Sequence, residues 1–508
     1  MFSVDDGLIP TCKEPLTIQE KSILIKPRGV YKQLQNLDSK KGPGPDGLSP
    51  ALLKFLSDYI YRSLSAIFQY SINLGSVPQD WRDANVVPIY KKGSRSDPLN
   101  YRPISLTSIA SKILEHIICH DVNSFLDDNN LLANCQHGFR KEHGCDTQLL
   151  STLSDLVDHY DRNTPIDIAV LDFQKAFDVV PHQKLILKLR ATGIHNQTCK
   201  WIESWLSDRR LAVTVNGASS SRRHASSGVL QGSVLGPLLF LIYINDMPNS
   251  VLNSSLRLFA DDSLIYKPIS SPSDTASFQA DLDRLHDWSL TWQMKFNIAK
   301  CEFMRISRPS LNPPSLPTYY LNGCNLTYTT HVKYLGIYID QFLSFDRQIT
   351  TMCRKATGVL HMLMRSLKKA KTKTRSLAYK TICRPILEYG SQSWAPHKEK
   401  HIKLIEAINR KAFRWAFSKK KYDEISVHMI ENIWPTLLER RRFADLNLYF
   451  KARSGNAKVD DDKIEIHHDS DYNTRTGGVR GIINTNVKRH YFQQRIHNYL
   501  NPLYGPND

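Results

Sequence analysis

Two adjacent aspartates follow a short apolar run near the middle of this 508-residue chain. Asp261 and Asp262 lie between residues 256–260 and 263–266, and both flanking runs are rich in apolar and aromatic side chains. This pattern predicts two strands joined by a tight turn, with the two carboxylates at its tip. Most such pairs are solvated turn residues. Adjacent carboxylates repel each other, however, and a divalent cation relieves that repulsion, so the hairpin is also a candidate metal site.

A third carboxylate strengthens the metal interpretation. Asp172 directly follows residues 166–171, which are apolar and rich in β-branched side chains, as in a buried strand. Three carboxylates from two strands can hold two Mg²⁺ ions, about 3.5–4 Å apart in such sites, around an in-line phosphoryl displacement. Nucleotide polymerases use this arrangement.

The composition limits the class of protein. A formal net charge of +18 is compatible with a polyanionic partner or with a generally basic surface. The nine cysteines are dispersed without a Cys-x-x-Cys pair, which predicts reduced thiols inside a cell and argues against a zinc site or a disulfide framework. The most apolar run, residues 234–244, is too short to span a membrane and predicts buried core.

Local patterns predict several elements. Residues 85–90, 101–106 and 211–217 are strand-like, and residues 40–47 form a basic loop rich in glycine and proline. Helices are predicted at 108–125, with Ser108 or Ser111 as the cap, at 282–292, and over much of the basic region 346–417.

Six different segments then occur in order along the chain, at residues 87–93, 100–106, 169–178, 228–237, 259–262 and 333–337. Among them are Asp-Phe-Gln-Lys-Ala-Phe-Asp at 172–178, Gly-Val-Leu-Gln-Gly-Ser at 228–233 and Phe-Ala-Asp-Asp at 259–262. Together they resemble the reverse transcriptase of non-LTR (LINE-type) retrotransposons, across residues 30 to 420. Order, spacing and residue chemistry agree at once, which a chance match to one motif does not achieve.

The resemblance implies an α+β right-hand polymerase with fingers, palm and a helical thumb. We predict an N-terminal extension at 1–80, fingers and palm at 81–345, the thumb at 346–420 and a basic C-terminal segment at 421–508. Neither the endonuclease that precedes the polymerase in such elements nor an RNase H or zinc knuckle is recognisable. We therefore expect a truncated element copy or a partial gene model.

The resemblance also assigns the reacting centre. Asp172, Asp261 and Asp262 match the catalytic, metal-binding carboxylates. The backbone that starts at Phe173 is expected beside the incoming triphosphate, and Phe177 under the sugar, where an aromatic ring leaves no room for a 2′-hydroxyl. The alternative for Phe177 is an ordinary core side chain. Asp178 matches a further acidic position, where a helix N-terminal or salt-bridge role is as plausible as catalysis.

Other positions match substrate contacts. Lys91, which the motif does not separate from Lys92, and Arg102 match the cations that hold the triphosphate. Gln231 and Gly232 match a loop near the template or sugar, and Lys300 the lysine near the leaving pyrophosphate. The alternative for these cations is a solvated face. Leu335 and Gly336 match the primer grip.

The predicted function is RNA-directed DNA synthesis from dNTPs on an RNA template, with a DNA primer, an RNA–DNA hybrid product and two Mg²⁺ ions. Nothing in the sequence indicates a membrane or an obligate protein partner. The expected location is intracellular, in the nucleus or in a cytoplasmic ribonucleoprotein. The alternative is an inactive or domesticated element-derived protein that binds RNA without catalysis.

Overall fold

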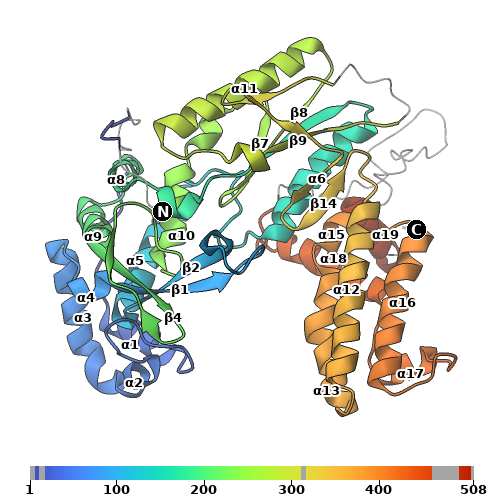
Figure 1. Ribbon diagram of the computed structural model, residues 1–508, viewed down its shortest axis with the longest axis horizontal. Coiled ribbons are helices and arrows are strands. Elements are labelled where there is room, and N and C mark those ends of the chain that lie inside the picture. The colour runs from blue at the N-terminus through green and yellow to red at the C-terminus, as the bar shows by residue number, and fades with distance from the viewer. Residues whose placement is uncertain (1–5, 11–17, 310–315, 460–490, 505–508) are drawn as a thin grey trace. The chain divides into compact units, whose positions relative to one another are not determined.

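The structure, a computed structural model, describes residues 6–10, 18–309, 316–459 and 491–504. Within them the chain divides into two compact units that are discontinuous in sequence, and each is described by itself (Figure 1). The first unit comprises Met1–Phe139, Asp172–Leu252 and Asp281–Ile298, and the second comprises Arg140–Leu171, Asn253–Ala280 and Ala299–Asp508. The predicted domain boundaries stay predictions, and residues 460–490 and 505–508 of the predicted C-terminal segment lie outside the described residues.

The first unit is a small sheet with helices. Its sheet has the strand order β2-β1-β4-β5, and β6 also pairs with β4. The strands are β1 (Ala84–Tyr90), β2 (Tyr101–Thr107), β4 (Arg209–Val215), β5 (Ala218–Ser219) and β6 (Arg223–Ala225). The helices are α1 (Pro27–Gln35), α2 (Pro50–Phe55), α3 (Ser57–Leu74), α4 (Gln79–Arg82), α5 (Ile109–Asp128), α7 (Ala176–Val179), α8 (His182–Ala191), α9 (Asn196–Leu206) and α10 (Leu235–Ile244), with short 3₁₀ turns η1 (Pro98–Asn100) and η2 (Met247–Ser250).

Several predictions for this unit are confirmed. The strands predicted at 85–90, 101–106 and 211–217 are β1, β2 and β4. Helix α5 begins directly after Ser108, whose side chain accepts a hydrogen bond from the Ser111 N–H, so Ser108 is the cap. Helix α10 is almost entirely buried, as expected for the most apolar run of the chain.

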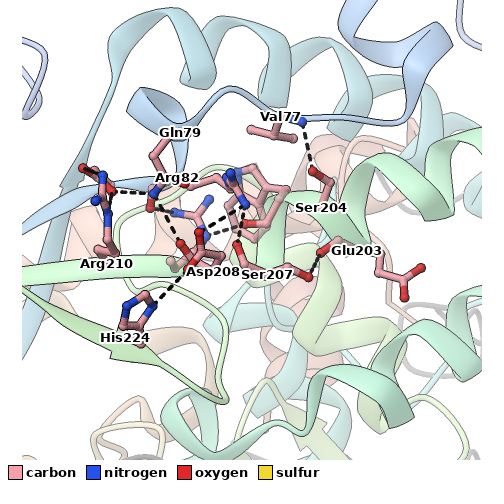
Figure 2. A network of polar contacts seen from close by, with 12 residues as sticks. Val77, Gln79, Arg82, Glu203, Ser204, Ser207, Asp208, Arg210 and His224 are labelled. Atoms are coloured by element: carbon pink, nitrogen blue, oxygen red, sulfur yellow. Dashed lines mark hydrogen bonds and ion pairs between the residues drawn. The ribbon is translucent and has the colours of Figure 1, made fainter.

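A polar network fixes strand β4 in the sheet (Figure 2). Asp208, the residue before β4, lies 3.8 Å from Arg82 of α4 and 3.0 Å from the ring of His224 on β6. Arg210 donates two hydrogen bonds of 2.9 Å to the Asp83 carboxylate. These charge-assisted contacts join α4, β4 and β6, and thereby support the parallel pairing of β4 with β1.

The second unit contains a five-stranded sheet and a group of helices. The sheet order is β12-β9-β3-β8-β7, and α6 packs against β3 and β7. The strands are β3 (Ile166–Leu171), β7 (Ser255–Phe259), β8 (Asp262–Pro268), β9 (Glu302–Ile306), β10 (Tyr320–Leu321), β11 (Cys324–Asn325), β12 (Thr327–Tyr328), β13 (His331–Tyr334) and β14 (Ile337–Asp340). The helices are α6 (Cys145–Asp161), α12 (Asp346–Ser366), α13 (Thr372–Ala378), the π-helical η4 (Tyr379–Cys383), α14 (Arg384–Glu388), α15 (Ser391–Trp394), α16 (Glu399–Ala416), α17 (Ser426–Glu431), α18 (Leu437–Arg453) and α19 (Phe492–Tyr504).

One hydrophobic core runs through the second unit. It joins sheet residues such as Ile168 and Leu264 to Ile337 of the β13–β14 hairpin and to Leu360 and Phe413 of the helices. All five side chains are fully buried or nearly so. Because this core is shared, the β13–β14 hairpin is held firmly against the sheet and helices of the same unit.

A buried ion pair fixes the register of the same sheet. Asp167 of β3 accepts two hydrogen bonds of 2.6 Å from Arg305 on β9, and a third of 2.6 Å from the Tyr319 hydroxyl. Asp167 and Arg305 are register partners. Both side chains are buried, and each compensates the charge of the other. A slip of one residue would place the two side chains on opposite faces of the sheet and leave a buried charge without its partner, so this pair specifies the pairing of β3 with β9.

The helix predicted at 282–292 begins earlier than the sequence pattern indicated. Helix α11 spans Pro272–Thr291, so the predicted start was wrong by ten residues. The Asp274 carboxylate accepts hydrogen bonds of 2.9 Å from the N–H groups of Ser270 and Ser271, which is a helix-start arrangement. Ser-Pro-Ser-Asp at 271–274 was the missed signal. No helix in the described ranges combines the length and hydrophobicity that a membrane span needs.

Candidate active site

The predicted aspartate hairpin is confirmed. Strands β7 and β8 pair antiparallel from Ser255↔Tyr266 to Phe259↔Asp262, which leaves Ala260 and Asp261 as the turn. Ala260 has φ 54°, a left-handed conformation that is unusual for a residue with a side chain. Such strain, of order 1 kcal/mol or more, persists where the surrounding structure enforces it, often at functional sites. Asp261 is half-buried and Asp262 is exposed.

Strand β3 brings Asp172 to the same end of the sheet. The last residue of β3, Leu171, is the register partner of Ser263 on β8. Asp172 directly follows Leu171 in the chain, and Asp262 directly precedes Ser263. Each aspartate is therefore bonded to one member of this register pair. The Asp172 carbonyl accepts a hydrogen bond of 2.7 Å from the Asn297 N–H, which fixes the backbone where the strand ends.

The donor set suits a hard divalent cation. Carboxylate oxygens are the ligands that Mg²⁺ prefers, and Mg²⁺ commonly takes only one or two of them and completes its shell with water and phosphate oxygens. In the part of the chain that the structure describes, no three His, Cys, Asp or Glu side chains are already gathered as a metal-binding group. The fit therefore rests on the chemistry of the aspartates and on their place at one end of the sheet.

Phe177 has one packed face and one accessible side. Its ring stacks on Phe240 of the buried helix α10 at a centroid distance of 4.4 Å, and meets the edge of Phe139 at 6.2 Å. Phe177 nevertheless stays partly exposed. The arrangement is compatible with both interpretations of Phe177, a core side chain and a ring under the sugar. A ring that is packed on one face can present a rigid surface to a sugar on the other. Phe173 is different, since it is buried and stacked on Phe296 at 4.6 Å, so its backbone is the part available to a substrate.

Asp178 has a definite partner, which sequence reasoning did not find. The Gln231 side-chain amide donates a hydrogen bond of 3.2 Å to the Asp178 carboxylate. Burial raises the pKa of Asp178 above its ordinary value, while the hydrogen bond from Gln231 opposes that shift. This hydrogen bond uses one of the two N–H donors of the Gln231 amide and fixes its orientation, so the carbonyl oxygen and the other N–H are the groups through which Gln231 can bind a ligand.

Gly232 is required where the same loop meets strand β2. The Ser105 N–H donates a hydrogen bond of 2.7 Å to the Gln231 carbonyl. Gly232 has φ 101°, and a Cβ there would lie 2.9 Å from the Ser105 carbonyl oxygen. A side chain at 232 would therefore push the loop away from β2.

The predicted triphosphate cations lie at one end of the β1–β2 pair. Arg102 is the register partner of Ile89, and Lys91 follows the last residue of β1. Both side chains are exposed. The Lys91 N–H donates a hydrogen bond of 2.8 Å to the Asn100 carbonyl, which closes the connection between the strands. Lys92 is also exposed, so the structure does not separate it from Lys91.

Leu335 and Gly336 form the tight turn between β13 and β14, which we term the primer-grip turn. Both have positive φ, 44° and 84°, and Leu335 is unusual in that region. Tyr389 approaches this turn closely. Burial, a hydrogen bond with Cys145 and the charges of Asp146 and Asp262 raise the pKa of Tyr389 above its ordinary value. Among these causes, the charge of Asp262 has the smallest effect.

The predicted site residues fall into two groups. The first unit contains those predicted to bind substrate before chemistry, which are Lys91, Arg102, Phe173, Phe177, Gln231 and Gly232. The second unit contains Asp261, Asp262, the primer-grip turn and Lys300, which is exposed in the short 3₁₀ turn η3 (Ile298–Lys300). Asp172 begins a segment of the first unit and is bonded to the last residue of β3 in the second. Assignments of individual roles stay predictions.

Comparison with known families identifies this arrangement. Residues 89–339 match the family described as "Reverse transcriptase (RNA-dependent DNA polymerase)". The chain contains a reverse transcriptase domain. The match spans both units and includes all twelve predicted site residues, from Lys91 to Gly336. It confirms the predicted fold class, the α+β right-hand polymerase.

Curated relatives place this reverse transcriptase among those of mobile elements. The chain is 30% identical over 399 residues to the probable RNA-directed DNA polymerase from transposon X-element of Drosophila melanogaster, a match that covers 77% of this chain and 44% of that protein. It is 30% identical over 397 residues to the polymerase from mobile element jockey of the same species, covering 76% of this chain and 43% of that protein. The predicted kinship with non-LTR retrotransposon polymerases is confirmed.

A more distant relative agrees. The Pol polyprotein from the type-1 retrotransposable element R1 of Bradysia coprophila is 25% identical over 376 residues, which cover 72% of this chain and 36% of that protein. The chain thus spans less than half the length of these curated relatives. Reverse transcriptases generally use divalent metal ions and act on a nucleic-acid template and primer.

Proposed function

We propose that this chain is an RNA-directed DNA polymerase of a non-LTR retrotransposon, which adds dNTPs to a primer 3′-hydroxyl on an RNA template. The observation that carries the proposal is the reverse transcriptase match over residues 89–339, with its carboxylates at the ends of β3 and the β7–β8 hairpin. In the reaction, the primer 3′-oxygen bonds to the α-phosphorus, the bond to pyrophosphate breaks, and the hydroxyl proton is released.

The chain's own residues have separate tasks in this proposal. Asp172, Asp261 and Asp262 would hold two Mg²⁺ ions, whose chemistry when bound is Lewis-acid activation of the hydroxyl and neutralisation of phosphate charge. Arg102 and Lys91 bind the triphosphate, and Lys300 neutralises or protonates the departing pyrophosphate.

Two further residues orient the nucleotide. Gln231, held by Asp178, presents its side-chain amide to the nucleotide or template, and Phe177 lies under the sugar. The location of the protein in the cell stays a prediction.

Primer extension tests the proposal directly. Purified full-length chain, a DNA primer annealed to an RNA template, dNTPs and Mg²⁺ should give template-length DNA, and omission of the divalent cation should stop synthesis. Tight RNA binding without any extension, under several divalent cations, would instead support the element-derived RNA-binding protein that lacks catalysis.

The α12–α13 connection predicts a salt-dependent contact with nucleic acid. Lys368, Lys369 and Lys371 are exposed there, and Lys373 is exposed in the first turn of α13. Each phosphate contact releases counterions and adds roughly 0.7–0.9 to the slope of log affinity against log salt. Replacing all four lysines with glutamine should therefore reduce that slope by up to about 3, as measured by anisotropy titrations of a primer–template at several salt concentrations.

The matched control replaces the same four lysines with arginine. This variant keeps every charge, so its salt slope should equal that of the wild type. An unchanged slope in the glutamine variant would show that these lysines are only a solvated face of the second unit.

A further inference from the structure

The primer-grip turn is strained and needs support from outside its own hairpin. Leu335 has φ 44°, in a region that residues with a side chain seldom occupy. The flanking strands are short, with only Tyr334↔Ile337 to His331↔Asp340 paired. A two-stranded hairpin of this size is marginal alone, so contacts with neighbouring elements decide the orientation of its turn.

Tyr389, which follows helix α14, makes such a contact. Its hydroxyl donates a hydrogen bond of 2.9 Å to the Leu335 carbonyl oxygen, across 54 residues of sequence. Its ring lies against Gly336, where a Cβ would be 3.2 Å from the ring. The absence of a side chain at Gly336 therefore lets the phenol reach the turn.

Tyr389 is itself held rigidly. Its N–H donates to the Pro385 carbonyl at 3.1 Å, and its own carbonyl accepts a hydrogen bond of 2.8 Å from the buried indole of Trp394. The next residue, Gly390, has φ 62°, and a Cβ there would lie 2.6 Å from Ile337 of β14. The backbone around Tyr389 is thus packed directly on the hairpin that it supports.

The hydrogen bond from the Tyr389 hydroxyl orients the whole peptide group between Leu335 and Gly336. Leu335 C=O and Gly336 N–H belong to one planar trans peptide group, in which the C=O and N–H bonds point in opposite directions. Fixing the carbonyl toward Tyr389 consequently makes the Gly336 N–H point away from Tyr389, from the opposite edge of the peptide group. A backbone N–H presented in this way is a suitable donor to a phosphate oxygen.

We infer that Tyr389 is a positioning residue, whose hydroxyl holds the Leu335–Gly336 peptide so that the Gly336 N–H meets the phosphate nearest the primer 3′ end. The inference rests on the proposed function, since it takes the primer as the ligand of this turn. It assigns a task to a tyrosine outside the six motifs, in a segment that follows the π-helical η4 and α14.

The test is a thermodynamic cycle on binding, which does not require catalysis. The full chain and its Tyr389→Phe variant bind two primer–templates, one native and one whose 3′-terminal internucleotide phosphate is an uncharged methylphosphonate. Tyr389→Phe keeps the ring and removes only the hydroxyl. We expect it to weaken binding of the native primer about 3- to 10-fold, the loss typical of one hydrogen bond, and to leave binding of the methylphosphonate primer unchanged.

Tyr320→Phe is the matched control. Tyr320 is in the same unit and is 45% exposed, against 43% for Tyr389. Removal of the Tyr320 hydroxyl should change the affinity for neither of the two primer–templates. Thermal melts of all three proteins verify that the variants are folded.

The outcomes separate the inference from the proposed function. Equal losses on both primers, or no loss on either, would overturn the role of Tyr389. If Tyr389→Phe weakens binding of the native primer alone but the wild type extends no primer, only the proposed polymerase activity is overturned. If the wild type extends primers but Tyr389→Phe binds both primers as tightly as the wild type does, only the inference is overturned. Failure of the wild type to bind the duplex at all would overturn both.

Discussion

Replacing Asp261 with asparagine is expected to abolish primer extension while leaving the fold and RNA binding largely intact. Asp261 is in the turn of the β7–β8 hairpin, and asparagine tolerates such turns well. The substitution keeps the shape of the side chain but removes the charge that would hold Mg²⁺. Because metal ions supply several kcal/mol of transition-state stabilisation, the rate should fall roughly a thousandfold or more.

Single-turnover extension rates, RNA affinity and a circular-dichroism melt measure these three properties. Asp287→Asn is the matched control, since Asp287 is an exposed carboxylate on α11 away from the motifs. It should extend primers at the wild-type rate. Wild-type rates in Asp261→Asn would refute the assignment of the hairpin as the metal site.

Trimming Phe177 to valine is expected to admit ribonucleotides. The Phe177 ring is supported from behind by Phe240 at 4.4 Å, so it cannot retreat easily from a 2′-hydroxyl. A steric clash of this kind costs about 1–3 kcal/mol, which corresponds to roughly 5- to 150-fold discrimination. Relative incorporation of rNTPs against dNTPs should rise by that factor in Phe177→Val, with some loss of overall activity because the packing against Phe240 is weakened.

The control and the competing interpretation are both measurable. Phe177→Tyr keeps the aromatic ring and should retain the wild-type preference for dNTPs. If Phe177 is only a core side chain, Phe177→Val should lower the melting temperature and leave the sugar preference unaltered. That result, in a folded and active variant, would exclude a steric gate at this position.

Local sequence was sufficient for the elements that carry the reacting groups. Strand β3 has the bounds predicted from its apolar run, and Asp261 is in the predicted turn. Ser108 caps α5 because a cap depends only on residues within one helical turn. The motif residues were likewise identifiable by order and spacing, because each motif is a short contiguous string. The start of α11 was missed, although its signal at Asp274 was equally local.

The hydrogen-bond partners of the candidate site residues could not be predicted from the local sequence. Gln231 is held by Asp178 from 53 residues away, and the Leu335 carbonyl by Tyr389 from 54 residues away. Neither pair has a sequence pattern, since a long-range hydrogen bond depends on where two separate segments meet. The division of the site residues between two units is a further result of this kind.

The sequence by itself therefore determined the chemistry of this chain: the carboxylates, the hairpin that carries two of them and the family of the domain. These follow from short-range preferences and from contiguous motifs. Only the tertiary structure decided how Gln231 and the primer-grip turn are oriented, and that the buried Asp167 carboxylate is paired with Arg305. The physical reason is that burial and hydrogen-bond partners are properties of the packed chain, and both depend on contacts between residues far apart in sequence.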